Sequence, residues 1–494
     1  MNKKLKKTDS LIFGTLFLIA LLFVLSSTYT PFNFRQMHVD SSIYMTITQG
    51  IIRGQLPYRD FVDNKGPLMY LLNVPGFMIG SFTGVWITEL LLMCITVLFA
   101  YKTALFFTGK NKALLTTACT FAAALAFFKT PVGTEEYALP FLMISFYLFV
   151  KYCWRGAQKD ASFFELAVLG FCLACAVLIR LNMFPLWVGF CLVIFAESIA
   201  KRRFALLGKY ILGFCIGIGI VFIPVFFYLK ANGIVADFLN QVVFGGASRG
   251  FGGASLKQTI QNWYIVASRN YSFIPLLWGI FAIIKNYKQK DMLFWTGYTF
   301  SYILAVLFLA FSSGDSHYNL TLIPFFVPVI AVLVEMLYAV FAAAHRRNVV
   351  IILFLCIVFS EGLMKYGDDF MEVFTNHSGQ ELMRAGKMID ENTQDGGKII
   401  SLGYNGYIYP FTQRVAASKY IYQRSGVVQI QGGSREEFVS SVLTEKPAII
   451  VIYGADKGGY DYLPAWYNPI YKMMADEYEL LSDENGFYLF KKKF

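Results

Sequence analysis

Charged residues are scarce in this sequence, and that scarcity is its first structural signal. Asp, Glu, Lys and Arg make up only 15% of the 494 residues, whereas soluble domains average about 25%. Hydrophobic residues make up 56%, and many stand in runs close to the ~20 residues that cross a bilayer as a helix. The composition therefore excludes an ordinary soluble protein and predicts a polytopic α-helical membrane protein.

Several other missing signals each argue against a class of site or segment. No cysteine lies beyond Cys356, so the polar C-terminal region needs no disulfide framework. Cys172 and Cys175 have zinc-like spacing, but their apolar run has no partner pair, which favours ordinary helix residues. No Gly-rich phosphate turn follows Tyr366, which argues against a nucleotide site there. No small-x-small cleavage site follows the first apolar run, so we expect an uncleaved first helix.

The net charge of +11 suggests nucleic-acid binding, but its distribution argues against that partner. From Lys365 onward the chain has 14 basic and 17 acidic residues, so the basic excess belongs to the apolar part. Short basic connections between membrane spans set topology by staying on the cytoplasmic side. We therefore expect no nucleic-acid partner.

Eleven apolar runs are candidate membrane spans. They fall near residues 11–28, 85–107, 113–128, 135–150, 163–179, 182–198, 205–229, 271–285, 291–311, 319–344 and 348–363. Basic residues occupy the N-terminal segment and every second connection: Lys3, Lys4, Lys6 and Lys7; Lys110 and Lys112; Lys151, Arg155 and Lys159; Lys201, Arg202 and Arg203; Lys285, Lys288 and Lys290; Arg346 and Arg347. This alternation predicts a multi-pass protein of the plasma membrane with a cytoplasmic N-terminus and an extracytoplasmic C-terminal region.

Five segments then lie outside. They are residues 29–84, 129–137, 180–182, 230–270 and 312–318. The apolar stretch 67–83 is short and interrupted by proline and glycine, so we expect a helix that lies at the outer interface or dips into it. The loop 230–270 contains a near repeat, FGGASRG and FGGASLK, beginning at Phe244 and Phe251. Two interpretations stay open, a mobile lid over a lipid-facing site and a flexible connection.

From about Tyr366 the pattern becomes that of a small α/β domain. Periodicity predicts helices over GQELMRAGKMIDENTQDG and SREEFVSSVLTEKP, strands over KIISLGY and AIIVIYGA, and a closing hairpin over YELLSDENGFYLFKKKF. We expect a membrane domain over residues 1–363, with 29–84 as its catalytic outer loop. A small extracytoplasmic α/β domain over 364–494 follows it.

Charged and polar residues gather on the predicted outer face. They are His38, Asp40, Arg59, Lys65, Glu135, Glu136, Arg180, Asp315 and His317. Charges near the mouths of spans are costly unless they line a wet cavity, so together they form a candidate site. Any single one of them is equally compatible with an ordinary loop charge.

One reaction uses this mixture of groups. When a glycosyl group leaves a lipid phosphate, negative charge builds on the phosphate and is stabilised by Lys or Arg in a low-dielectric site. The phosphate leaves as an anion, so no carboxylic acid has to protonate it, unlike the leaving group of glycosidases. One carboxylate then takes the proton of the acceptor hydroxyl. We assign Asp40 as this base and Lys65 as the phosphate ligand, while Glu135 or Glu136 positions the acceptor, the base or a divalent ion.

These residues also resemble a known family. The acidic residue after the first span, followed by GQLPYRDFVDNKGPL, is similar to the first outer loop of bacterial GT-C glycosyltransferases. These enzymes are related to protein O-mannosyltransferases and aminoarabinose transferases. TEEYALPF resembles their second acidic loop, IRLN a basic position after a later span, and HYNLTLIPF a late-span motif. The resemblance covers the layout of residues 10–365. It implies a GT-C fold, a polyprenyl-phosphate-linked sugar as donor, transfer on the outer membrane face, and inversion at the anomeric carbon.

The expected site comprises three sets of residues. The catalytic set is Asp40, Glu135 and Glu136; the phosphate-binding set is Lys65, Arg59 and Arg180; the substrate-binding set is His38, Tyr58, Asp63, Asp315 and His317. A Glu pair stands where relatives often have an Asp, so the role of the pair and of a divalent metal ion stays open, and we expect no other cofactor. The expected partners are the lipid-linked sugar, membrane lipid, and an envelope polymer, glycolipid or protein as acceptor.

Two other functions fit parts of the pattern. Eleven spans with charges near helix ends also suit a lipid or glycan transporter or flippase. Transporters, however, are usually built from matching halves with sites near the midplane, and Glu335 is the only acidic residue well inside an apolar run. The gathering of charge on one face also disfavours a non-catalytic scaffold.

Overall fold

A computed structural model describes residues 2–35, 38–128, 131–154, 160–245, 256–269, 272–285, 292–311, 315–403, 406–423, 435–453 and 465–493. The chain forms two compact units. Unit 1 comprises Met1–Ser27, Trp86–Phe227 and Gly250–Glu372, and unit 2 comprises Thr28–Val85, Tyr228–Arg249 and Val373–Phe494. Each unit therefore joins segments that are far apart in the sequence.

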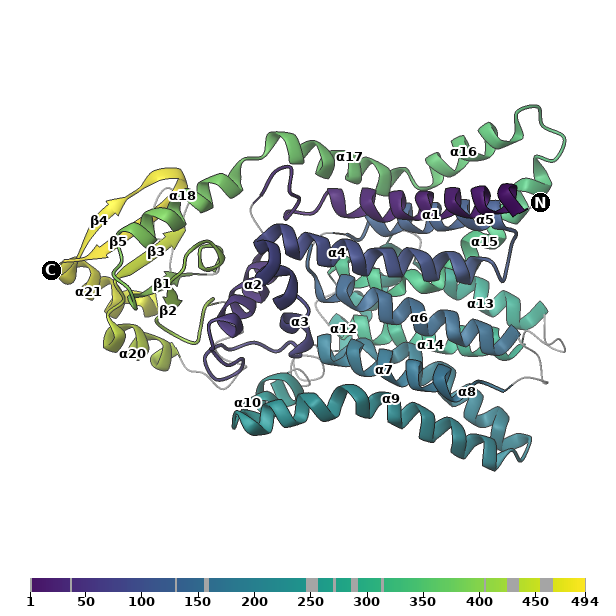
Figure 1. Ribbon diagram of the computed structural model, residues 1–494, viewed down its shortest axis with the longest axis horizontal. Helices are drawn as coiled ribbons and strands as arrows, with labels where there is room; N and C mark the ends of the chain where they lie inside the picture. Colours follow the sequence, from purple (N-terminus) through teal and green to yellow (C-terminus); the bar gives the residue numbers. More distant parts are fainter. Residues whose placement is uncertain are drawn as a thin grey trace. The chain divides into compact units, whose positions relative to one another are not determined.

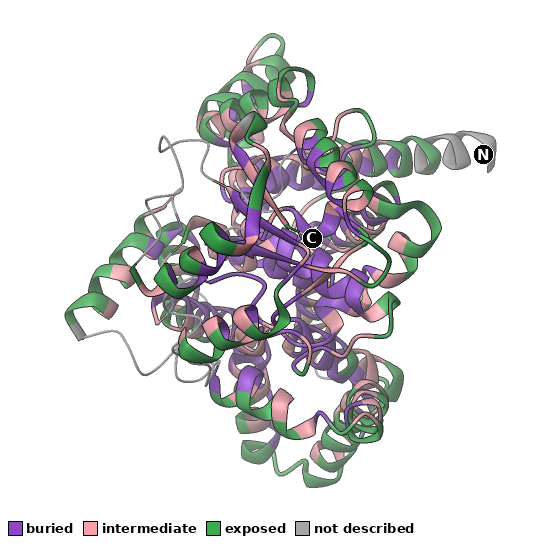
Figure 2. Ribbon diagram, turned by 90° about the vertical axis from the view of Figure 1, so that its left-hand side faces the viewer, coloured by how far each residue is buried: buried purple, intermediate pink, exposed green. Residues whose placement is uncertain are grey.

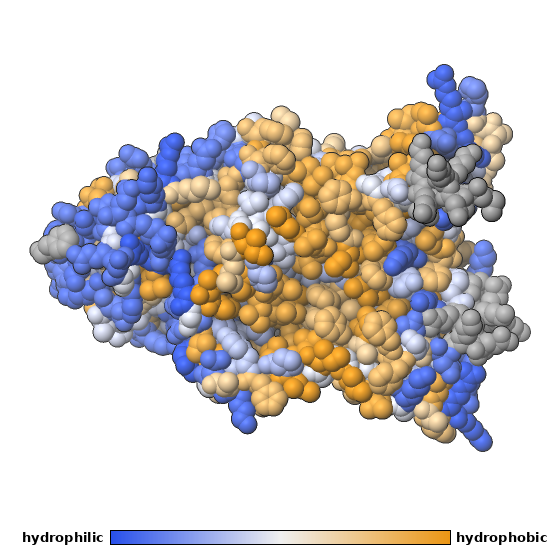
Figure 3. Space-filling view, in the orientation of Figure 1, coloured by the Kyte–Doolittle hydropathy of each residue, from blue (hydrophilic) through white to orange (hydrophobic). Residues whose placement is uncertain are grey.

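Unit 1 consists of long apolar helices that lie side by side (Figure 1). They are α1 (Asn2–Leu25), α4 (Val74–Ala104, which begins in unit 2), α5 (Lys110–Leu125), α6 (Thr134–Trp154), α7 (Phe163–Ile179), η1 (Leu181–Met183), α8 (Pro185–Ala200), α9 (Phe204–Ala231, which ends in unit 2), α12 (Leu256–Ser268), α13 (Phe273–Lys285), α14 (Met292–Ala310), η4 (Ser316–Leu322), α15 (Ile323–Val340), α16 (Arg347–Val358) and α17 (Ser360–Thr375, which ends in unit 2). Each of the eleven apolar runs coincides with one of these helices, and the surface over them is largely hydrophobic (Figure 3).

The predicted helical membrane fold is confirmed, whereas the number of spans stays a prediction. Among the described residues, six helices are long and apolar enough to cross a bilayer. A seventh span results if α16 and α17, which meet at a 75° bend, count as one. Shorter apolar helices such as α7 and α13 make up part of the difference from eleven.

The interrupted stretch 67–83 forms α3 (Leu68–Leu71) and the first turns of α4. Gly80 and Ser81 leave the helical conformation, and a Cβ atom on Gly84 would collide with the carbonyl oxygen of Gly76. The chain therefore folds back on itself at this point. A helical segment of about 12 residues reaches only ~18 Å, which is too short for the ~30 Å hydrocarbon core. This short length agrees with the expected helix at the outer interface, and that placement stays a prediction.

Unit 2 is built around a five-stranded sheet of order β2-β1-β3-β5-β4. Its elements are α2 (Val39–Ile52), α3, α10 (Val235–Phe238), η2 (Leu239–Phe244), α18 (Ser378–Glu391), β1 (Lys398–Leu402), η5 (Tyr409–Phe411), β2 (Val415–Ala416), α20 (Arg435–Glu445), β3 (Ile449–Tyr453), η6 (Ala465–Tyr467), α21 (Asn468–Glu477), β4 (Tyr478–Ser482), η7 (Glu484–Gly486) and β5 (Phe487–Lys492). Strands β2, β1 and β3 are parallel, while β5 pairs antiparallel with both β3 and β4. The predicted small C-terminal α/β domain is confirmed, although the sequence pattern did not predict α21 or β2.

The segment predicted to be the first outer loop packs into the core of this sheet domain. Val62 is buried with Ile400 and Ile450, and its backbone N–H donates to the carbonyl oxygen of Lys419 at 3.0 Å. On α2 the amide of Gln49 donates to the carbonyl oxygen of Pro410 at 2.9 Å. Strands β1 and β3 are buried along nearly all of their length (Figure 2). Packing thus groups residues 28–85 with the C-terminal domain, whereas the linear boundary at 363–364 separates them.

Candidate active site

Asp40 stands in the first turn of α2, in unit 2. The helix begins after His38, whose Nδ1 atom accepts the backbone N–H of Asp40 at 3.4 Å. A carboxylate in the first turn is stabilised by the positive end of the helix dipole. The side chain of Asp40 is half-buried, and none of the described residues donates a hydrogen bond to its carboxylate. Asp40 therefore offers an uncommitted carboxylate that is held on a rigid element.

Lys65 lies on a loop that buried hydrogen bonds hold in place. Tyr58 adopts a left-handed conformation, with φ of 68°, and its hydroxyl donates to the carbonyl oxygen of Lys65 at 2.8 Å. The carboxylate of Asp63 accepts the hydroxyl of Tyr70 at 2.7 Å. Burial, and after it the nearby Asp63 carboxylate, raises the pKa of Tyr58 and Tyr70 well above the usual value. Both phenols therefore stay protonated, and they act as fixed donors to this loop.

The ammonium of Lys65 is half-buried and donates to the side-chain oxygen of Asn64 at 2.8 Å. Tyr58 and Asp63 are only 2% and 3% exposed, so their polar atoms face the loop. Arg59 is exposed, and its guanidinium donates to the carbonyl oxygen of Asn232 at 2.6 Å. The structure thus brings a rigid loop, Lys65 and Asp40 into one unit.

Gln241, which sequence reasoning missed, connects the long 230–270 segment to this loop. Its amide nitrogen donates to the carbonyl oxygen of Tyr58 at 2.6 Å, and its amide oxygen accepts the N–H of Asp63 at 3.2 Å. It lies in the π-helical turn η2, and such turns are frequent at functional sites. The base of the segment is therefore bound to the first loop. The repeat that begins at Phe244 and Phe251 lies largely in residues 246–255, outside the described residues.

We expect Gln241→Ala to loosen the Lys65 loop without unfolding the protein. A hydrogen bond contributes a net ~0.5–1.5 kcal/mol, so losing two of them corresponds to roughly tenfold easier opening. Hydrogen exchange measured by mass spectrometry on peptides covering residues 58–65 would show this acceleration. Gln380→Ala, at an exposed position of α18, is the matched control. Equal exchange rates in the two variants would contradict the role of Gln241.

In unit 1, Glu135 and Arg180 form an ion pair. Glu135 lies in the first turn of α6 and is 3% exposed, while Arg180 ends α7. A guanidinium nitrogen of Arg180 contacts Oε1 of Glu135, and Oε2 accepts the hydroxyl of Thr134 at 2.9 Å. The guanidinium also stacks over the ring of Tyr318, 4.3 Å from its centroid. Both charges of the pair are therefore committed to fixed partners.

Glu136 takes part in a different network, in which Glu89 is a residue that the sequence did not single out. The backbone N–H of Val132 donates to Glu89 at 2.8 Å and to Glu136 at 2.9 Å. The other oxygen of Glu89 accepts the hydroxyl of Ser27 at 2.8 Å. Val132 has φ of 57°, a strained value for a β-branched residue. The two buried carboxylates therefore fix the turn that precedes α6 and its Glu135.

Substituting Glu89 by Ala is expected to destabilise unit 1. Val132 and Ser27 would each lose a buried acceptor, at about 1–3 kcal/mol for each unsatisfied donor. Glu89→Gln keeps one carbonyl acceptor and should cost less. Glu197→Ala removes only a partly exposed pair with Lys201, which contributes about 0–1 kcal/mol. Thermal unfolding in detergent should therefore give the order Glu197→Ala, Glu89→Gln, Glu89→Ala; any other order counts against this assignment.

The last two predicted site residues, Asp315 and His317, lie in the chain shortly before Tyr318. Asp315 is exposed and precedes η4. His317 is half-buried, with its ring centroid 4.3 Å from that of Tyr318. Its Nδ1 atom is buried and has no hydrogen-bond partner among the described residues. Unit 1 therefore assembles Glu135, Arg180 and His317 around Tyr318.

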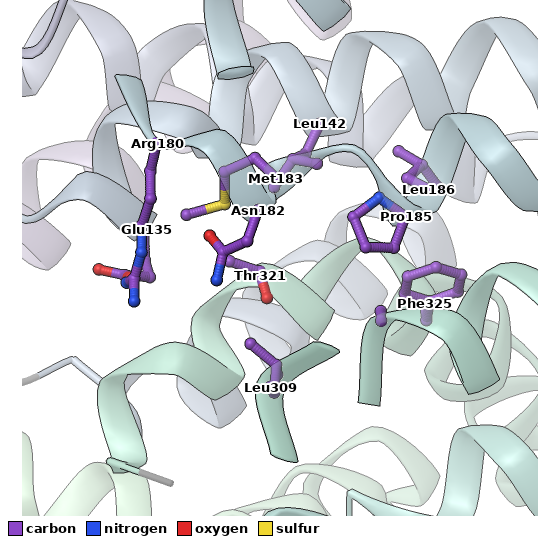
Figure 4. Close-up of a pocket in the computed structure, with 11 residues that line it drawn as sticks. Glu135, Leu142, Arg180, Asn182, Met183, Pro185, Leu186, Leu309, Thr321 and Phe325 are labelled. Atoms are coloured by element: carbon purple, nitrogen blue, oxygen red, sulfur yellow. The ribbon is translucent and has the colours of Figure 1, made fainter. Parts of the chain in front are cut away.

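A pocket opens beside this pair (Figure 4). It has an empty volume of about 380 Å³. It is lined by Glu135, Leu142, Arg180, Asn182, Met183, Pro185, Leu186, Ala305, Leu309, Thr321 and Phe325. In the described residues, no three His, Cys, Asp or Glu side chains are grouped as metal ligands. No chemical step proposed below uses a divalent ion, whose role stays open.

The fold is shared with two groups of solved structures. ArnT from Cupriavidus metallidurans in the apo state is 13% identical and has a TM-score of 0.61, with 98% of each chain covered. The same protein bound to undecaprenyl phosphate is 12% identical with a TM-score of 0.59. The archaeal oligosaccharyltransferase AglB from Archaeoglobus fulgidus, in complex with an inhibitory peptide and a dolichol-phosphate, is 11% identical. Its TM-score is 0.55, with 90% of this chain and 70% of AglB covered. The expected GT-C-like fold is confirmed.

The sequence itself matches one protein family. No curated protein is similar enough in sequence to count as a match. A family profile described as the putative competence-induced protein Ccs4 N-terminal domain matches residues 2–364. This match covers most of the chain, including the first outer loop and all the membrane helices up to the start of α17. The chain therefore belongs to the putative competence-induced protein Ccs4 N-terminal domain family.

Proposed function

We propose that the protein is an integral-membrane glycosyltransferase. It moves a sugar from a polyprenyl-phosphate donor to a cell-envelope acceptor, on the outer face that the basic connections predict. The observation that carries this proposal is that unit 2 contains both the uncommitted Asp40 carboxylate and the rigidly held Lys65 loop. Solved structures of the same fold support it, since ArnT is known bound to undecaprenyl phosphate and AglB in complex with an inhibitory peptide and a dolichol-phosphate.

The proposed reaction is a single displacement. The acceptor hydroxyl loses its proton to Asp40 as its oxygen attacks the anomeric carbon from the face opposite the phosphate. The bond between that carbon and the phosphate oxygen breaks, and the configuration inverts. Polyprenyl phosphate leaves as an anion, and Lys65 stabilises the charge that develops on it. Arg59 adds a second cation on the same loop.

The other expected site residues act indirectly in this proposal. Tyr58 and Asp63 are buried, so they act by holding Lys65. Glu135 orients Arg180, whose charge it partly neutralises. Glu136 fixes the turn before α6. We therefore assign base catalysis to Asp40 alone.

Mass spectrometry of envelope glycans from cells with and without the gene tests this function. We expect one glycan, glycolipid or glycoprotein to lose a sugar when the gene is absent, and to regain it when the gene is restored. An unchanged envelope under expression conditions contradicts the proposal. In vesicles containing the purified protein, a flippase would instead move lipid-linked sugars across the membrane without breaking the bond to phosphate.

A further inference from the structure

The pocket beside Arg180 has a polar side and an apolar side. Its polar residues are Glu135, Arg180, Asn182 and Thr321, and the remaining lining residues are apolar. In Figure 4 the Glu135–Arg180 pair lies at one end, Pro185 and Phe325 lie at the other, and Asn182 and Thr321 appear between them. Sugars present this combination, because their hydroxyl groups point outward while their C–H groups form apolar faces. Ligand sites commonly combine apolar walls with a few placed polar groups.

The charges of Glu135 and Arg180 in the pocket cancel, and both groups already have interaction partners. Arg180 is held by Glu135 and by the ring of Tyr318, and Glu135 also accepts from Thr134. A sugar carboxylate would be attracted by Arg180 but repelled by Glu135, and a sugar ammonium would meet the reverse, so neither gains a net attraction from the pair. Either would also have to compete with a buried, hydrogen-bonded ion pair, whose disruption is strongly unfavourable. The pocket therefore favours a ligand without net charge.

Asn182 indicates what kind of neutral ligand the pocket suits. Its side-chain oxygen is buried and has no hydrogen-bond partner among the described residues. Buried polar atoms are nearly always paired, so this amide is suited to an incoming donor. The hydroxyl of Thr321 donates to the carbonyl oxygen of Tyr318 at 2.9 Å, which leaves its own oxygen able to accept. The side-chain oxygens of Asn182 and Thr321 can each accept a hydrogen bond, and the amide nitrogen of Asn182 can donate one. Together they suit neighbouring hydroxyl groups on one sugar ring.

We propose that this pocket binds one neutral monosaccharide unit, a pentose or hexose without a carboxylate or an amine. Its lining holds only a few polar groups between apolar walls, which suits a single ring rather than an oligosaccharide. The inference rests on the proposed function, because the unit is either the sugar of the donor or the terminal sugar of the acceptor. Asn182 forms hydrogen bonds with the hydroxyl groups of the sugar, and the Glu135–Arg180 ion pair disfavours binding of charged sugars.

Saturation-transfer NMR on the purified full-length chain in detergent tests this directly. The probes are the methyl glycosides of glucose, galactose, mannose and arabinose, with methyl glucuronide and methyl glucosaminide as charged probes. We expect at least one neutral glycoside to bind and neither charged one to do so. Asn182→Leu, which keeps the side-chain size but cannot hydrogen-bond, should reduce the signal at least fivefold. Asn392→Leu, in unit 2, should leave it unchanged.

The outcomes separate this inference from the proposed function. Binding of a charged glycoside in preference, no binding of any neutral one, or full binding by Asn182→Leu each overturns it. Thermal unfolding confirms that the variants are folded, and the milder Asn182→Ser replaces any that is not. If extracted polyprenyl-phosphate sugars displace the bound glycoside, the pocket binds the sugar of the donor. If wall-glycan fragments displace it, the pocket binds the terminal sugar of the acceptor. Because no transfer is measured, sugar binding can hold even if the envelope experiment contradicts glycosyl transfer.

Discussion

Asp40→Asn is expected to abolish sugar transfer while leaving the protein folded and inserted. Asparagine has nearly the same shape and keeps the oxygen, but it cannot accept the proton of the attacking hydroxyl. A general base contributes roughly 10²–10⁴-fold to rate, so the modified envelope component should fall below detection in cells that carry only this variant. Because none of the described residues donates to the Asp40 carboxylate, the substitution breaks no hydrogen bond among them. Mass spectrometry of envelope glycans measures the loss.

The matched control is Asp476→Asn, an exposed change on α21 that should leave the envelope unchanged. Equal amounts of both variants in the membrane fraction, with equal unfolding temperatures, exclude a defect of folding or insertion. Normal modification by Asp40→Asn would remove Asp40 as the base. The proposal would then require another acidic residue of unit 2, since Glu135 and Glu136 already hold their own partners.

Local patterns predicted the parts of the fold that local chemistry determines. Runs of apolar residues predicted the membrane helices, and alternation of apolar residues predicted β1, β3 and the β4–β5 hairpin. Asp40 and Lys65 could be proposed as site residues from the sequence because their motifs are short and contiguous, and their roles stay predictions. Helix α21 was missed because its apolar positions alternate with a proline and several polar residues.

The residues that sequence reasoning missed depend on contacts across long stretches of chain. Gln241 is a polar residue in an apolar segment. Its role depends on two hydrogen bonds to a loop about 180 residues earlier in the chain. Glu89 lies near the start of the apolar run 85–107, and only the folded chain brings Val132 and Ser27 to it. Val62 reads as an ordinary loop residue, but it completes the core of the C-terminal sheet. No periodicity within one segment contains this information.

The packing of Val62 also gives the C-terminal domain a role that the sequence did not suggest. Residues on both sides of it, Tyr58 and Lys65, belong to the loop proposed to hold the donor phosphate. The sheet domain therefore supports this loop from one side, while Gln241 holds it from the 230–245 segment. We infer that the C-terminal domain contributes to donor binding by keeping the loop in one conformation, a positioning role that reduces the entropy lost on binding.

Lys65→Ala is expected to weaken binding of undecaprenyl phosphate by about 10- to 100-fold. A hydrogen bond to a charged group contributes roughly 1.5–3 kcal/mol, and tenfold in affinity corresponds to 1.4 kcal/mol. The loop itself should persist, because Tyr58 and Tyr70 bind the backbone oxygen of residue 65 and the Asp63 side chain, which the substitution leaves in place. Titration of the purified protein with undecaprenyl phosphate, followed by native mass spectrometry, gives the affinity.

Two further variants separate the charge of Lys65 from its place in the loop. Lys65→Arg keeps the charge on a longer, planar group, so affinity should recover only in part. Lys472→Ala removes an exposed lysine of α21 and should change nothing. If the ammonium pairs with phosphate, added salt should weaken binding by the native protein more than by Lys65→Ala, because screening acts on the charge that the variant lacks. If Lys65→Ala binds undecaprenyl phosphate as tightly as the native protein at low salt, the phosphate binds elsewhere. The Lys65 loop would then not be the phosphate-binding loop.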